Sequence, residues 1–512
     1  MALRFTAPFS LHLHRRCRGK RRARQAMALA RALAIAALAQ FTTAAHAEWL
    51  IAQSPHFRVP ADMPEADIRA RVALLEDYRN LLIQMTKGDV SEAAERPLDV
   101  FIVETMAPAF PFGRAPPGLA GLYTANPGGI AAYDDPSSLG QDALQHEYAH
   151  HYMRANRAAA YPAWYVEGFA EYFMTARFKP QEIEVGRFNE MRARWLAGND
   201  WLPLETILKR DIYGRGAGPV MMFYAQSWLM THCFLGAPGQ ADKLKAYLGA
   251  VAAGGDPVQA FATHVASDFK RFQSDLRAYV RGRDFVSITF RRPAAAPVPV
   301  QVRPAPPGAS SLLLLINRLM LSGGEDTAED RAAREAAVKR VIARAPGSPL
   351  AARARALLAV RNGDPAAASL LDPLLAASPD DADLLLWRAA ATPVATPEGR
   401  LEARRFLARA FKANPDDWCV MRLYALLAGL REGPLTANDL DVIRRAHELA
   451  PQVAQVVIDH ATALVQVGDF KTAAAVLAPV ANNPHDAKLA TLAGRLRDAA
   501  LAGDRKAFLK WL

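Results

Sequence analysis

Two histidines and a glutamate with fixed spacing are the residues of this chain best suited to chemistry. His146, Glu147 and His150 form an HExxH motif within the stretch LQHEYAHHYM. Residues four apart lie on the same face of a helix, so the two imidazoles can bind one metal ion. A hydrolytic zinc site uses three protein ligands and keeps one position open for water. The motif therefore predicts a Zn²⁺ site in which Glu147 is catalytic and takes a proton from that water.

The motif stands in a sequence that favours helices. Only 12 of the 512 residues are His, so a chance HExxH in this chain is about a one-in-a-hundred event. Ser137 and Ser138 can cap a helix over about 139–155. Pro162 can begin a second helix over 163–176.

The second helix supplies two further carboxylates. Glu167 and Glu171 are four apart and share a face, and their neighbours in PAWYVEGFAEYF are mostly apolar. A solvated acidic face is the structural alternative, but so apolar a helix should be buried. Buried carboxylates are rare unless they are paired or bind metal. Spacing alone permits either glutamate as the third ligand.

The segments HEYAHH (146–151) and WYVEGFAEYF (164–173) resemble those of gluzincin zinc metallopeptidases, most closely the peptidase MA-like family. The second segment is similar to WLNEGFAEYF of zinc aminopeptidases, in which the glutamate before glycine is the third zinc ligand. The resemblance thus implies Glu167 as that ligand. In thermolysin-like relatives a carboxylate four residues further on hydrogen-bonds a zinc-bound histidine, and this implies the same role for Glu171.

The chain departs from the aminopeptidase pattern in two places. Glu167 follows His150 slightly more closely than in those enzymes, and Val166 replaces their asparagine. No GAMEN-like motif is present to hold a substrate amine, so aminopeptidase specificity does not follow. The resemblance covers about residues 48–290. It implies an α+β domain in which an edge strand near the site pairs with extended substrate.

Three more polar residues are candidates near the site. Tyr224 and His232 lie on a predicted helix over 223–234, and either could stabilise an oxyanion, as Tyr or His does in gluzincins. Tyr224 is the one we assign to catalysis, although a tyrosine on an apolar helix is more often part of the core. His151 points away from the face of His150 and is expected to be supporting or structural.

The segment before the motif predicts a small sheet with one helix. Alternating or β-rich runs predict strands at 49–51, 56–59 and 98–103, and apolar spacing predicts a helix over 65–85. Asn126-Pro127-Gly128-Gly129 lies between two further runs, 121–124 and 130–133, and indicates a hairpin.

The first 47 residues have the order of a secretory signal. They contain nine Lys or Arg and no acid, and the basic cluster is followed by a mostly apolar run, Met27 to Ala39, and then by Ala45-His46-Ala47. Met27 could be the true start. The apolar run is too short to span a bilayer unaided, which disfavours an anchor. We expect cleavage before Glu48 and a periplasmic or secreted protein.

Most of the positive charge belongs to this leader. The whole chain has a net charge of +11, and without the nine leader cations 53 basic side chains face 51 acidic ones. The charge of the chain without its leader therefore gives no reason to expect a nucleic-acid partner. Cys233 and Cys419 remain, in different predicted domains, so a disulfide is not expected.

Regular prolines mark the C-terminal part. Pro346, Pro379, Pro415, Pro451 and Pro484 follow one another at nearly constant intervals. Three glycines precede three of these prolines by one and the same interval: Gly363 before Pro379, Gly399 before Pro415 and Gly468 before Pro484. The pattern resembles the tetratricopeptide repeat, whose period is about 34 residues, and an irregular helical bundle is the alternative. Such arrays are all-α solenoids that usually bind peptides or proteins.

The expected organisation has four parts. These are a signal peptide (1–47), a zinc metallopeptidase-like domain (48–290), a linker (291–310) and helical repeats (311–512). The linker contains six prolines between Arg292 and Pro307, which favours extended backbone, and part of it could add a strand to a neighbour. We expect the repeats to be removable from about residue 311 without unfolding the first domain.

The function expected from the sequence is an exported zinc peptidase coupled to a protein-binding repeat domain. The alternative is a noncatalytic, metallopeptidase-like scaffold whose repeats carry the function. The complete HExxH motif favours the enzyme, because a scaffold has no need of Glu147. A zinc hydrolase that acts on a substrate other than peptides would use the same ligands.

Overall fold

A computed structural model defines the fold of the chain. It describes residues 49–86, 97–103, 106, 119–135, 141–156, 159–212, 216–282, 285–292, 298–306, 308–321, 327–430, 434–483 and 486–512. Trp49–Leu512 forms one compact unit. The predicted signal peptide lies outside the described residues. None of the described helices has the length and apolar character needed to cross a membrane.

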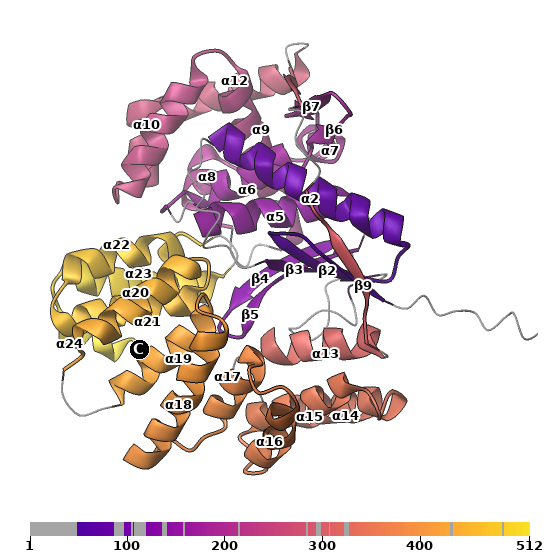
Figure 1. The fold of residues 1–512 in the computed structure, drawn as a ribbon. Helices are drawn as coiled ribbons and strands as arrows, with labels where there is room; N and C mark the ends of the chain where they lie inside the picture. Colours follow the sequence, from indigo (N-terminus) through magenta and orange to yellow (C-terminus); the bar gives the residue numbers. More distant parts are fainter. Residues whose placement is uncertain are drawn as a thin grey trace, which may run out of the picture. The chain divides into compact units, whose positions relative to one another are not determined.

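A six-stranded mixed sheet forms the centre of the first half (Figure 1). Its order is β4-β5-β3-β2-β1-β9. The strands are β1 (Leu50–Gln53), β2 (Phe57–Ala61), β3 (Leu98–Ile102), β4 (Gly121–Asn126), β5 (Gly129–Asp134) and β9 (Gln301–Pro304). β2, β3 and β5 are mutually parallel, whereas β4, β1 and β9 pair antiparallel with their neighbours. The predicted strands and the hairpin are confirmed, so the first part is α+β.

One face of this sheet is covered by the first helices. α2 (Glu65–Thr86) makes the crossover between the parallel strands β2 and β3. α5 (Gln141–Asn156) packs against α2, β4 and β5. Buried side chains on this face include Val100, Ile102 and Ala132, which alternate with residues that point the other way. The predicted helix over 65–85 is confirmed.

The other face is covered by α13 (Ala309–Leu321), below the sheet in Figure 1. Phe101 and Tyr133, stacked with ring centroids 5.4 Å apart, pack there against Leu313, Leu314 and Leu321. The same helix also contributes to the core of the following helices. The segment predicted to be a repeat thus begins with a helix that completes the core of the sheet.

A helical layer and a small sheet extend the first half beyond α5. The small sheet consists of β6 (Arg177–Phe178), β7 (Glu182–Val185) and β8 (Ile288–Arg291). The helices are α6 (Ala163–Phe173), α7 (Glu190–Gly198), α8 (Leu204–Lys209), α9 (Ala217–Gly236), α10 (Gln240–Ala252), α11 (Pro257–His264) and α12 (Phe269–Arg281). α9 is central to this layer, because it packs against α6, α7, α10 and α12.

The C-terminal half consists of consecutive packed helices. They are α14 (Ala328–Arg344), α15 (Pro349–Asn362), α16 (Ala367–Ala377), α17 (Ala382–Ala390), α18 (Pro397–Ala413), α19 (Trp418–Gly429), α20 (Ala437–Leu449), α21 (Ala454–Val467), α22 (Phe470–Ala481), α23 (Ala487–Leu501) and α24 (Arg505–Lys510). From α15 onward each packs on the next, and α15 also contacts α17, α17 contacts α19 and α21 contacts α23. This is a stack of helix pairs.

The prolines mark the beginnings of these pairs. Pro346, Pro379, Pro415 and Pro451 lie in the connections before α15, α17, α19 and α21, and Pro484 lies outside the described residues. The tetratricopeptide-like identity of the pairs stays a prediction.

Two of the three repeat glycines have the predicted role. Gly363 (φ 64°) and Gly468 (φ 91°) end α15 and α21 in the left-handed conformation, which suits a turn between paired helices. Gly399 differs, because it lies inside α18, where a Cβ atom would come 1.8 Å from the carbonyl oxygen of Pro393.

The proline-rich segment is not an isolated spacer. Its strand β9 pairs antiparallel with β1, with Leu50 opposite Pro304. The possibility that this segment adds a strand to a neighbour is therefore confirmed. Residues 293–297 lie outside the described residues.

We predict that a fragment ending at residue 310 will not fold stably, contrary to the expectation from sequence. The cut would remove α13 and expose Phe101 and Tyr133. Full burial of one leucine stabilises by roughly 1.5–3 kcal/mol, and whole domains are stable by only about 5–15 kcal/mol. Circular dichroism and thermal unfolding of residues 48–310, beside 48–512, will show this. A soluble fragment that unfolds cooperatively would support the domain boundary near residue 310 that the sequence predicted.

Candidate metal centre

Two helices place the candidate ligands. α5 carries His146, Glu147 and His150, and its predicted capping serines lie outside the described residues. α6 begins after Pro162, whose extended backbone (ψ 142°) precedes the first turn. From Val166 to Phe173 every residue of α6 is buried, because the helix packs between α5 and α9. The expected burial of the second helix is confirmed.

Gly168 allows a close approach of a neighbouring helix. A Cβ atom at Gly168 would come 2.1 Å from Thr231 Oγ1 and 2.4 Å from the Ser227 carbonyl oxygen, both on α9. The glycine therefore permits close contact between α6 and α9.

Three potential ligand atoms converge where α5 faces α6. His146 Nε2 lies 3.0 Å from His150 Nε2, and Glu167 Oε2 lies 3.8 Å and 3.5 Å from these two nitrogens. Zinc bonds of about 2.0–2.1 Å at tetrahedral angles separate neighbouring ligand atoms by about 3.3 Å. The arrangement fits a tetrahedral ion with one position left for water. Among the described residues, these three form the group that could hold a metal ion.

Burial favours the ligand form of both imidazoles. It lowers the pKa of His146 to about 4 and the pKa of His150 to about 3. Both rings are therefore neutral near pH 7, as metal binding requires. Burial raises the pKa of Glu167 to about 7, and the neighbouring His146 opposes this shift. A cation at the centre would favour the ionised carboxylate.

Glu171 forms an ion pair with Arg192. Arg192 of α7 donates through Nε to Glu171 Oε2 at 2.8 Å and through Nη2 to Oε1 at 2.5 Å. Asn189 Nδ2 donates to Oε2 at 3.2 Å. Oε1 also lies 3.6 Å from His146 Nδ1, the nitrogen that faces away from the cluster. The placement agrees with a supporting role, although this separation is longer than a hydrogen bond.

Glu147 is positioned by the edge strand β4. Its Oε2 accepts a hydrogen bond from the Tyr123 backbone N–H at 2.8 Å. Gly121 leaves space for it, because a Cβ atom there would come 3.1 Å from Glu147 Cγ. Burial is the main cause that raises the pKa of Glu147 to about 8, whereas the N–H of Tyr123 and the charge of Arg154 oppose the shift.

Tyr224 lies near the cluster and His232 does not join it. The Tyr224 ring is 6.5 Å from the His146 ring, centroid to centroid, and the guanidinium of Arg192 lies over it at 5.2 Å. The negative charge of Glu167 and burial raise its pKa, so the phenol keeps its proton. His232 contacts Tyr279 Oη and the Gly186 carbonyl oxygen, each at 2.8 Å, and an oxyanion role for His232 is therefore wrong.

His151 has the structural setting expected for it. Its Nδ1 lies 3.2 Å from Tyr123 Oη, and its ring contacts those of Tyr123 and Tyr148. It thus supports the strand whose backbone holds Glu147. Cys233 and Cys419 are not joined to each other by a disulfide.

Four residues that position the site had not been singled out from the sequence. They are Tyr123, Arg154, Asn189 and Arg192. Arg154 had a detectable signal, since it lies four residues after His150 on the same helical face. Tyr123 acts through its backbone, and the other two lie on or beside a different helix, so no local pattern indicated them.

Comparisons of the chain with protein-family models, with curated proteins and with solved structures gave no match. The gluzincin resemblance therefore rests on the residues quoted above, and the functional argument rests on the geometry of the site.

We predict that Glu167→Ala nearly abolishes zinc binding, whereas Glu171→Ala weakens it about 10–100-fold, as loss of a supporting partner typically does. Glu167 faces both imidazoles, and Glu171 is engaged by Arg192. Zinc titration of both variants, each checked by circular dichroism, measures the difference. A larger loss of affinity in Glu171→Ala would reverse the assignment.

The burial of Asp134, which lies on β5 opposite Gly121, leads us to expect that the stability of the fold depends on pH. Asp134 is fully buried, with Arg71 Nη1 at 3.6 Å, and burial raises its pKa from 3.8 to about 7. Because the folded state binds the proton more tightly, this group destabilises the fold as pH rises from about 4 to 7, by about 4 kcal/mol in all.

We therefore expect Asp134→Asn to unfold at a higher temperature than the natural chain at pH 8 and at nearly the same temperature at pH 4. Thermal melts of both proteins across this range provide the test. Asp372→Asn, at an exposed carboxylate that pairs with Arg388, serves as a control. An equal difference at both pH values would show that the Asp134 carboxyl does not titrate in this way.

Proposed function

We propose that the protein is a zinc-dependent hydrolase, most specifically a peptidase, that uses His146, His150 and Glu167 as ligands. The observation that carries the proposal is the convergence of these ligand atoms at tetrahedral spacing beside Glu147. A structural zinc site would have four protein ligands and no need of an adjacent carboxylate. Among the described residues, the cluster has three.

The chain's own groups have complementary roles in hydrolysis. Zinc would supply Lewis acidity toward a water and toward the carbonyl oxygen of the substrate. The Tyr123 N–H holds one oxygen of Glu147, so the other oxygen, Oε1, would accept the water proton and pass it to the leaving amine. The protonated phenol of Tyr224 would donate to the oxygen on which negative charge develops. Glu171 and Arg192 would keep the His146 ring in place.

The edge strand favours a peptide as substrate. β4 is the outer strand of the sheet, and the backbone of its Tyr123 lies against Glu147. An extended peptide added along this edge would bring its backbone near the ligand cluster. The expectation of export comes from the leader sequence and remains part of the proposal.

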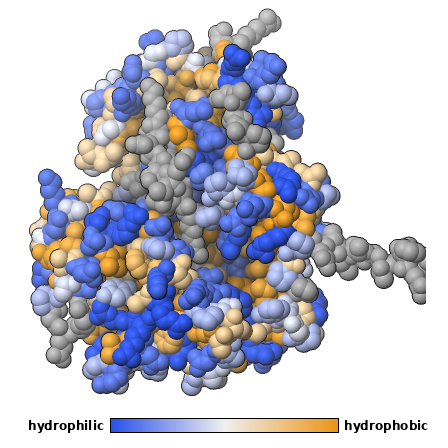
Figure 2. Space-filling model, in the orientation of Figure 1, coloured by the Kyte–Doolittle hydropathy of each residue, from blue (hydrophilic) through white to orange (hydrophobic). Residues whose placement is uncertain are grey.

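The helix pairs are proposed to bind a protein partner. Apolar side chains are exposed on them, among them Leu401 and Phe411 of α18 and Leu426 of α19. Figure 2 shows apolar and hydrophilic residues interspersed on the face it draws. Metal analysis of the purified chain separates the enzyme from a noncatalytic scaffold, since about one zinc per chain favours the enzyme.

We predict that Glu147→Gln retains zinc but slows hydrolysis about 10²–10⁴-fold, the usual contribution of a positioned general base. Glu147 is adjacent to the ligands without being one of them, and Gln can still accept the Tyr123 N–H. Turnover on a peptide library and zinc content should be measured together. Glu190→Gln, at an exposed ion pair on α7, is the matched control. Equal turnover in the two variants would remove this mechanism.

A further inference from the structure

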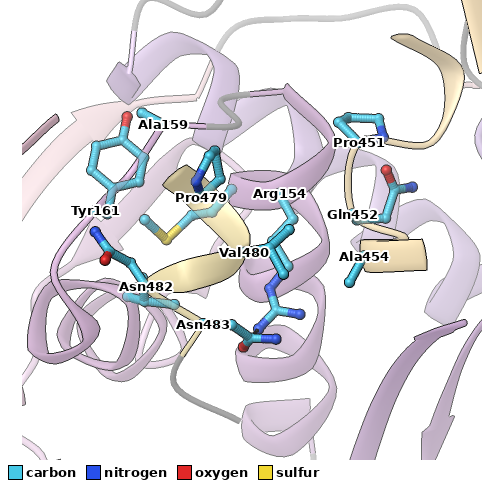
Figure 3. Close-up of a pocket in the computed structure, with 12 residues that line it drawn as sticks. Arg154, Ala159, Tyr161, Pro451, Gln452, Ala454, Pro479, Val480, Asn482 and Asn483 are labelled. Carbon is cyan, nitrogen blue, oxygen red and sulfur yellow. Dashed lines mark hydrogen bonds between the residues drawn. The ribbon is translucent and has the colours of Figure 1, made fainter. Parts of the chain in front are cut away.

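A cavity of ≈ 60 Å³ adjoins the end of the metal-binding helix (Figure 3). One wall comes from the end of α5 and the segment that leads into α6. The other comes from the start of α21 and the end of α22. A single water needs about 10–15 Å³ of such space. The cavity can therefore hold a group of several atoms, such as a carboxylate with part of its chain.

The cavity is next to the metal ligands in the sequence. Arg154 follows His150 by one helical turn on α5, and Val166 directly precedes Glu167 on α6. One helical turn rises about 5.4 Å, so Arg154 is about one turn from His150, and Val166 is one residue from Glu167.

Arg154 brings a cation to this wall. Its Nη2 donates to Asn483 Oδ1 at 2.7 Å, and this neutral amide is its hydrogen-bond partner among the described residues. Figure 3 shows the side chain extending toward Asn483. Burial lowers the pKa of Arg154, and the acids that oppose this effect include Glu167 and Glu147, which belong to the metal centre. Sequestered arginines normally have an acidic partner.

A second polar residue lines the same cavity from the segment before α21. Gln452 lines the cavity with 8% of its surface exposed. Its Oε1 has no hydrogen-bond partner among the described residues. A buried acceptor without a hydrogen bond costs about 1–3 kcal/mol. An N–H of a bound ligand would recover this free energy. Apolar side chains, among them Val166 and Val480, form the rest of the lining.

We propose that this cavity is a carboxylate-binding subsite of the metal centre. Arg154 binds a substrate carboxylate through its planar fork of N–H donors, and Gln452 accepts an N–H from the same residue of the substrate. The proposal rests on the proposed peptidase function. The carboxylate could belong to the C-terminus of a peptide or to an acidic side chain, and both present the same chemistry. The repeats then take part directly in substrate selection.

The test measures binding without requiring hydrolysis. Calorimetry on the full chain, metal-free and zinc-loaded, would compare N-acetylglycine with N-acetylglycinamide, and N-acetylglutamate α-amide with N-acetylglutamine α-amide. The first pair tests a C-terminal carboxylate and the second an acidic side chain. We expect the carboxylate of at least one pair to bind about 10- to 100-fold more tightly than its amide.

Variants test whether Arg154 causes the preference for the carboxylate. Arg154→Gln should abolish the preference, and Arg154→Lys should retain only part of it. Gln452→Leu should weaken acid and amide alike, because all four probes carry an acetamido N–H. Arg497→Gln, at an exposed arginine of α23, should leave the preference intact. Equal affinity for acid and amide in both pairs, or a preference that survives Arg154→Gln, would overturn the subsite.

The outcomes separate this proposal from the proposed function. A carboxylate preference in a chain that hydrolyses no peptide supports the subsite and contradicts the peptidase. Peptide hydrolysis without any carboxylate preference contradicts the subsite and leaves the peptidase in place.

Discussion

The ion pair between Glu171 and Arg192 determines the chemistry available at the candidate centre. α6 buries two carboxylates one turn apart, and one of them is matched by a guanidinium that donates to both of its oxygens. Glu167 is therefore the carboxylate that faces the two imidazoles. Both side chains are largely withdrawn from water, since that of Arg192 is 10% exposed and that of Glu171 is fully buried. Without Arg192 two buried charges would compete for one ion, and one would have to be protonated or exposed.

The parts of the fold that the sequence predicted are those set by short-range patterns. The HExxH spacing, the apolar run of α6, the hairpin around Gly128 and the strands before α5 are all local signals, and each element is present. The supporting residues depend on contacts between distant segments. Gly168 meets Ser227 and Thr231 of α9, and the cover of the sheet comes from α13, far along the chain from the strands. Periodicity carries no information on such pairings.

The helix pairs contribute to the first half more directly than a tethered module would. α13 seals the sheet, and Asn126 at the hairpin donates through Nδ2 to the Leu321 carbonyl oxygen at 2.6 Å. Ala125 and Ile130 of the same hairpin pack against the core formed by α19, α20 and α21. The strand that holds Glu147 is thus supported from its far end by the helices, so substitutions in this contact should affect the site without touching it.

The pairing of β1 with β9 has a consequence for synthesis of the protein. Leu50 emerges from the ribosome long before its partner Pro304, and α13 follows still later. Until then, the growing chain presents an incomplete sheet with one apolar face and one open edge. Chains in this state are prone to aggregate. The sheet therefore cannot be completed until residue 321 is available, whether the chain folds during synthesis or after export, so a truncated chain that ends before α13 should aggregate.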